Sequence, residues 1–139
     1  MTRKGRTATP RAVLLDTNAL LWLVTAPEKV SDSAREVLSE PSTELMVSAA
    51  SAWEIAIKTR LGRLDGEPLL CAWSEIIADM TATDLPIDAG DAVLAGRLPW
   101  EHKDPFDRVI VAQATRRNLT IATRDTHILR ATLTPTLHT

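Results

Sequence analysis

The sequence predicts one α/β domain in which helices cover a mainly parallel β-sheet. Short apolar or β-branched segments alternate along the chain with longer segments of helical periodicity, which is the order expected of strand–helix–strand units. Of the 139 residues, 45% are apolar, which is enough for a core of ordinary size. We expect this domain to occupy residues 12–139 and the basic residues 1–11 to form a flexible arm.

The strands are predicted where short apolar runs stop abruptly at polar residues. They lie at residues 12–15, 45–47 and 119–123, and a brief extended piece lies at 85–87. The threonine-rich tail over 131–139 has the composition of an edge strand, although Pro135 counts against one.

The helices are predicted from apolar residues that recur every three or four positions. They lie at residues 19–24, 31–40, 48–61, 69–80, 89–97, 105–117 and 126–130. Local signals mark some of their ends: Ser33 and Glu36 have the spacing of a capping box, Gly62 stops the third helix, and Asn118 caps the sixth. Cys71 lies among apolar residues of the fourth helix, so we expect it in the core.

Composition excludes several classes of protein. The 16 basic and 18 acidic residues give a formal charge of -2, so any contact with nucleic acid must be local. The single cysteine excludes an intramolecular disulfide and a multi-cysteine zinc site. No apolar run approaches the roughly 18 residues of a membrane span, and the basic start lacks the apolar block of a signal peptide. We therefore expect a soluble, cytoplasmic protein without a membrane partner.

Four carboxylates are predicted to meet at one edge of the sheet. Asp16 ends the first strand, Asp125 follows a later strand, and Glu54 lies in the first turns of the helix after the second strand. Asp107 lies on the apolar face of the helix over 105–117, which packs against the sheet. Because ligands bind at the carboxyl ends of parallel strands, this gathering predicts a functional site.

Gathered carboxylates of this kind call for a metal ion. Their mutual repulsion raises their pKa values unless a cation compensates. Mg²⁺, or Mn²⁺ in its place, suits an oxygen-only ligand set better than zinc does. Such an ion lowers the pKa of a bound water and neutralises charge on phosphoryl oxygens, which suits hydrolysis of a phosphodiester. Each acid also has a structural alternative, because Asp16 and Asp125 can cap helices and Glu54 can pair with Lys58.

The neighbours of the four acids are expected to support them. With Pro105 at the first helical position, Asp104 becomes the N-cap and Asp107 the third residue of the helix. Thr17, Asn18 and Thr123 are likewise expected as caps or as hydrogen-bonding neighbours.

Some basic and aromatic residues are candidates for RNA contact. Lys103 and Arg108 flank the acids and are the residues we expect at RNA phosphates. We expect Trp22, Trp53 and Trp100 in the core or an interface rather than as stacking platforms for bases.

Four motifs resemble those of the PIN-domain nucleases, and most closely those of VapC-like toxins of type II toxin–antitoxin pairs. They are Leu14-Leu15-Asp16-Thr17-Asn18, Ser51-Ala52-Trp53-Glu54-Ile55, His102-Lys103-Asp104-Pro105-Phe106-Asp107-Arg108 and Thr123-Arg124-Asp125. The likeness covers residues 12 to roughly 130, and the motif around Asp107 is the most specific. The basic arm before Ala12 is longer than the usual start of the family.

The resemblance implies a three-layer α/β/α sandwich and a Mg²⁺-dependent, site-specific endoribonuclease that cuts structured RNA such as tRNA or rRNA. Asp16, Glu54, Asp107 and Asp125 match the family's catalytic and metal-binding acids. It also implies a cognate antitoxin, and a homodimer or a toxin–antitoxin hetero-oligomer. The alternative is a non-catalytic PIN-like module that binds RNA or protein; it would need the acids to be lost, and all four are present.

Overall fold

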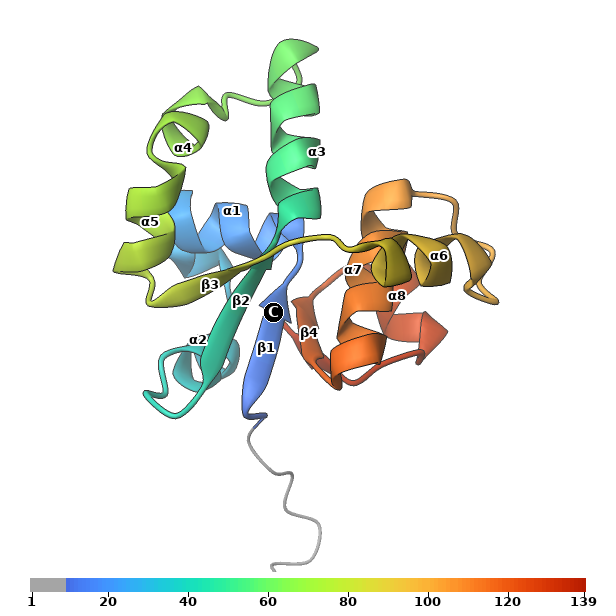
Figure 1. The fold of residues 1–139 in the computed structure, drawn as a ribbon. Helices are drawn as coiled ribbons and strands as arrows, with labels where there is room; N and C mark the ends of the chain where they lie inside the picture. The colour runs from blue at the N-terminus through green and yellow to red at the C-terminus, as the bar shows by residue number, and fades with distance from the viewer. Residues whose placement is uncertain (1–9) are drawn as a thin grey trace, which may run out of the picture.

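The computed structural model describes residues 10–139, and its centre is a five-stranded sheet (Figure 1). The strands are β1 (Ala12–Leu15), β2 (Glu44–Ser48), β3 (Ala82–Leu85), β4 (Thr120–Thr123) and β5 (Thr136–His138). They lie in the order β3-β2-β1-β4-β5, and every neighbouring pair is parallel. All the carboxyl ends therefore lie along one edge, as the alternation of strands and helices predicts.

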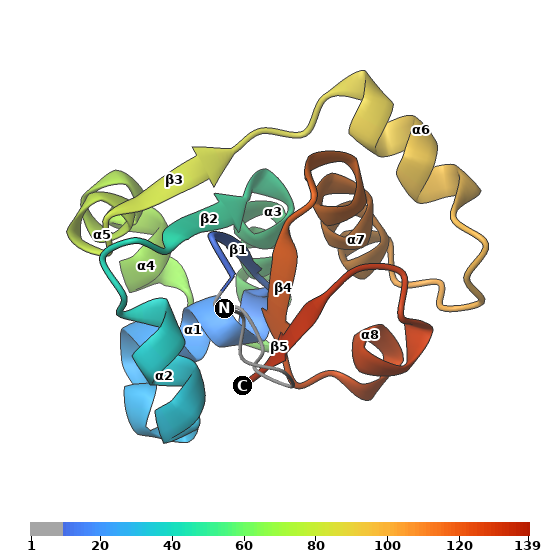
Figure 2. The same cartoon turned by 90° about the horizontal axis from the view of Figure 1, so that it is seen from below.

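Helices lie on both faces of this sheet (Figures 1 and 2). They are α1 (Thr17–Thr25), the 3₁₀ turn η1 (Pro27–Lys29), α2 (Asp32–Leu38), α3 (Ala49–Arg60), α4 (Glu67–Cys71), α5 (Trp73–Asp79), α6 (Ala89–Arg97), α7 (Pro105–Arg117) and α8 (Thr126–Ala131). Helices α1, α2, α4 and α5 contribute to the core on one face, and α6, α7 and α8 to the core on the other. The predicted three-layer α/β/α sandwich is confirmed.

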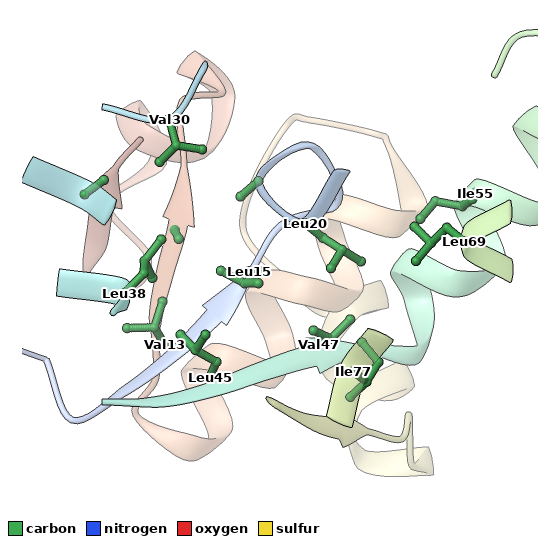
Figure 3. Close-up of a cluster of buried hydrophobic side chains, with 13 residues drawn as sticks. Val13, Leu15, Leu20, Val30, Leu38, Leu45, Val47, Ile55, Leu69 and Ile77 are labelled. Atoms are coloured by element: carbon green, nitrogen blue, oxygen red, sulfur yellow. The ribbon is translucent and has the colours of Figure 1, made fainter. Parts of the chain in front are cut away.

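The alternation of side chains along β1 explains the two cores. Val13 and Leu15 pack with Leu20 of α1 in one core, which Figure 3 shows, whereas Leu14 packs with Ile110 of α7 in the other. All of these side chains are fully buried. A strand that is apolar at every position is thus explained by burial on both faces.

A buried polar pair fixes α7 against the sheet edge. The Ser48 hydroxyl at the end of β2 donates to Gln113 Oε1 at 2.6 Å, and Gln113 Nε2 donates to the Pro86 carbonyl at 3.1 Å. Ser48 and Gln113 are both fully buried, so each needs the other to satisfy its hydrogen-bonding groups. This contact sets where α7, and therefore Asp107, stands relative to the strand ends.

Several predicted boundaries are confirmed. Gly62 follows α3 with a φ of 73°, and Asn118 ends α7 in the left-handed conformation. The tail forms β5, and Ile121 donates to the Pro135 carbonyl just before it. Within residues 10–139, no helix is long and apolar enough to cross a bilayer. The predicted basic arm lies almost wholly outside the described residues.

Four local predictions were wrong. The helix over 69–80 is broken at Ala72 into α4 and α5, and Cys71 is exposed rather than buried. Leu69 and Cys71 are two residues apart, so one short helix cannot turn both toward the core. The second helix is capped by Ser31 instead of Ser33, because the Ser31 hydroxyl accepts from the Ala34 amide. The extended piece expected at 85–87 is β3 (Ala82–Leu85), which begins three residues earlier.

Candidate active site

A small pocket of about 110 Å³ lies at the carboxyl edge of the sheet, and the structure brings all four predicted acids to it. Its lining comes from the ends of β1 and β4, from α3 and from the start of α7. The lining residues are Asp16, Thr17, Asn18, Glu54, Lys58, Asp104, Asp107 and Asp125.

Asp16 both caps a helix and faces the pocket. Its Oδ1 accepts from the Ala19 amide at 2.8 Å, which makes it the N-cap of α1, and only 5% of the residue is exposed. Burial raises the pKa of Asp16 from 3.8 to about 6; hydrogen bonds from Thr123 and Ala19 oppose the rise, and the charges of Asp125 and Glu54 add to it. The capping role and the site role are therefore compatible in one carboxylate.

Glu54 is held from both sides. Its Oε1 accepts from the Thr17 hydroxyl at 2.7 Å, and its Oε2 accepts from Lys58 Nζ at 2.6 Å. The Thr17 oxygen also lies 3.0 Å from the Ser51 hydroxyl, so the first and third helices are joined beneath the pocket. The ion pair with Lys58, which the sequence offers as an alternative, thus coexists with the place of Glu54 at the pocket.

Asp104 and Asp107 have the geometry that their spacing predicts. Asp104 is the N-cap of α7, since its Oδ1 accepts from the Asp107 amide at 3.0 Å. Asp107 Oδ2 lies 2.7 Å from His102 Nε2. Burial raises the pKa of Asp107 from 3.8 to about 6; the His102 hydrogen bond opposes this rise, and the charges of Asp104 and Asp125 reinforce it.

Asp125 is more exposed than the other acids. It caps α8 by accepting from the His127 amide at 2.7 Å, and its own amide donates to the Thr123 hydroxyl at 2.9 Å. Thr123 is fully buried, and its side chain also lowers the pKa of Asp16, so it acts on two of the acids. Asn18 is exposed and lines the pocket.

Arg108 has a structural use that its sequence position does not suggest. Its guanidinium donates to four backbone carbonyls, those of Ala95, Leu98, Trp100 and His102, at 2.7 to 3.0 Å. These bonds use Nε, both hydrogens of Nη1 and one hydrogen of Nη2, so four of the five guanidinium N–H groups bind the protein's own backbone. The expected contact of Arg108 with RNA phosphates stays a prediction. Arg108 fastens the α6–α7 connection to the start of α7. Lys103, by contrast, is exposed beside the acids.

Sequence reasoning missed two histidines. His102 contacts Asp107, and His127 Nδ1 lies 3.2 Å from Asp125 Oδ1. The two imidazoles stack with ring centroids 4.3 Å apart and planes at 14°. His102 lies five residues before Asp107, in a loop that leads to a capped helix. This spacing is a signal in the sequence that the two side chains can meet. The approach of His127 depends on tertiary packing.

The chemistry of the donors fits a hard divalent cation. Five carboxylates line one pocket, those of Asp16, Glu54, Asp104, Asp107 and Asp125. Burial, and the charges of neighbouring acids, raise the pKa values of Asp16 and Asp107. In the described part of the chain, Lys58 is the only cation that lines the pocket. Ligand atoms of His102, Asp104 and Asp107 lie within 4.8 Å of one another, so an imidazole nitrogen joins the oxygen donors. Asp104, expected only as a cap, therefore also lies within reach of an ion.

Comparison with solved structures gives the same fold. A chain of VapBC2 from Rickettsia felis bound to a promoter DNA fragment has a TM-score of 0.67 and 14% identity over 91% of this chain and 97% of that one. FitAcB from Neisseria gonorrhoeae gives 0.60 and 19%, covering 91% and 96%. A toxin–antitoxin complex from Klebsiella pneumoniae gives 0.56 and 20%, covering 82% and 87%.

Comparison with protein families identifies the chain. By sequence, it matches no curated protein. The family model described as "PIN domain" matches residues 13–132, which include all four acids and every strand except β5. The resemblance carried by the sequence motifs is confirmed. The chain belongs to the PIN domain family.

Proposed function

We propose that this protein is a Mg²⁺-dependent endoribonuclease and the toxin of a toxin–antitoxin pair. One observation carries the proposal: four carboxylates from separate segments line a single pocket, and burial and mutual repulsion raise the pKa of Asp16 and of Asp107 to about 6. A structure that only needed to be stable would not gather these charges, whereas a metal-dependent nuclease needs them.

The carboxylates of Asp16, Glu54, Asp107 and Asp125 would hold the ion, with Mn²⁺ able to replace Mg²⁺. When bound, the ion supplies a water of lowered pKa and neutralises charge on the phosphoryl oxygens.

The protein's own contacts orient these ligands. Thr17 and Lys58 fix the two oxygens of Glu54, and His102 fixes one oxygen of Asp107. Lys58 also supplies a cation at the pocket that can attract a phosphate. Preset ligands of this kind lower the cost of assembling the reactive geometry.

The substrate and the partners follow from the family and from its solved members. By resemblance, the substrate is a structured RNA such as tRNA or rRNA, and exposed Lys103 contacts its phosphates. The similar structures include a toxin–antitoxin complex, which supports a cognate antitoxin and either a homodimer or a hetero-oligomer with it. We place the reaction in the cytoplasm, where such RNAs occur.

The test is cleavage of a labelled RNA pool by the purified protein with Mg²⁺, with Mn²⁺ and with excess EDTA. We expect cleavage with either ion and none with EDTA or after Asp107→Asn. If RNA is bound but never cut under any of these conditions, the protein is a binding module. Cleavage that continues undiminished in EDTA would refute the metal mechanism. Failure of a small protein encoded beside the gene to bind and inhibit would count against the antitoxin pairing.

A further inference from the structure

A second, larger pocket adjoins the candidate active site. Its volume is about 370 Å³, and its lining residues come from the α6–α7 connection and from α8. Figure 2 shows where these two segments lie in the fold. His102 and His127 line it, and the same two residues contact Asp107 and Asp125 at the acid pocket. A ligand in the larger pocket would therefore adjoin whatever the acids act upon.

Aromatic rings form one side of this pocket. Trp100 and His102 have ring centroids 4.9 Å apart, and His102 in turn stacks on His127. Trp100 is only half-buried and lines the pocket beside its packing on the core. From the sequence we expect Trp100 in the core or an interface. In the structure Trp100 packs on the core and also lines this pocket. Aromatic rings that line a pocket are surfaces on which flat heterocycles stack.

The polar groups of the pocket suit a nucleotide. Arg130 is exposed at its rim, and a guanidinium binds phosphate oxygens through paired hydrogen bonds. Glu101 and Thr126 add an acceptor and a hydroxyl that can pair with the edge of a base. The volume lies in the range of pockets that bind small ligands.

We propose that this pocket binds one unpaired nucleobase of the RNA, next to the bond that is cut. Trp100 stacks on the base, Arg130 contacts its phosphate, and the choice of base at that position sets sequence preference. The inference rests on the proposed function, since the occupant is part of the same RNA. It requires a single-stranded or looped cleavage site, because bases in a duplex cannot reach a protein ring.

The first experiment measures binding without cleavage. Binding of a short single-stranded RNA, and of an abasic ribose-phosphate chain of equal length, is followed by fluorescence anisotropy in EDTA. Wild-type protein should bind the RNA about tenfold more tightly than the abasic chain, the effect of one good stacking contact. Trp100→Leu should lose that difference, and Trp100→Phe should retain most of it. Trp73→Leu is the matched control, because Trp73 packs away from this pocket and should leave the ratio unchanged.

The second experiment measures preference during cleavage. Sequencing the 5′ ends produced from a random RNA pool should show a base preference at one position beside the cut, which Trp100→Leu flattens. Arg130→Ala, at an exposed residue, should raise KM about threefold to tenfold, whereas Arg63→Ala, at an exposed residue in the turn after α3, should not.

The outcomes separate the inference from the proposed function. Equal binding of RNA and abasic chain, or an unchanged preference after Trp100→Leu, overturns the base pocket even if cleavage is efficient. Base-dependent binding through Trp100 with no cleavage at all supports the pocket and refutes the nuclease. If Trp100→Leu weakens only the antitoxin complex, the pocket is a protein-docking site and the inference is wrong.

Discussion

Replacing Asp107 with asparagine should separate the function of this residue from its effect on stability. Asparagine keeps the size of the side chain and can still hydrogen-bond to His102, but it carries no charge. Raising the pKa of Asp107 from 3.8 to about 6 corresponds to a cost of about 3 kcal/mol for keeping this buried carboxylate ionised. Without metal, at a pH of about 8, Asp107→Asn should therefore stabilise the fold by about 1 to 3 kcal/mol.

The same substitution should abolish cleavage. The assay pairs the RNA cleavage rate with urea unfolding in EDTA and in excess Mg²⁺. Wild-type protein should gain stability with Mg²⁺, because the ion binds the folded pocket and not the unfolded chain, and Asp107→Asn should gain little.

Asp104 supplies the matched control. Asp104→Asn keeps the N-cap of α7 and should retain substantial activity, whereas Asp104→Ala should cost about 1 kcal/mol of stability. The reasoning is refuted if Asp107→Asn cleaves normally, or if it destabilises the metal-free protein at this pH. An inactive Asp104→Asn beside an active Asp107→Asn would mean that the ligand and the cap are reversed.

Three further predictions follow from the same contacts. For the metal-free protein, the free energy of unfolding should rise as pH falls from about 7 to about 4. Folded Asp16 and Asp107, with pKa values of about 6, take up protons before the same residues do in the unfolded chain. Urea titrations at several pH values check this, and a flat profile contradicts it. Arg108→Leu should lower stability by about 3 kcal/mol, measured by urea unfolding, since four backbone carbonyls lose a charged donor, and a change under about 1 kcal/mol would contradict the fastening role. Lys103→Ala should leave stability unchanged and raise KM for RNA with kcat intact; an unchanged KM would remove it from the RNA contacts.

The sequence predicted those features that depend on short-range pattern. The buried strand over Ala12–Leu15 is apolar at every position, and the acid that follows it ends the strand and caps the next helix. Asp104 is predicted correctly as the cap of α7 and Asp107 as a pocket residue, and the structure adds that Asp104 also lines the pocket. If the strands are taken to be parallel, the sequence also predicts that the four acids gather at one edge of the sheet.

The tertiary structure decided what depends on distant segments. A single helical pattern covers residues 69–80, but the chain breaks at Ala72 into α4 and α5, and Cys71 is exposed. Arg108 binds carbonyls of α6 and of the loop that follows it, whose path the sequence does not give. His127 reaches His102 across 25 positions of sequence. Periodicity records which face of an element is buried, whereas the partner that buries it is set only when the whole chain packs.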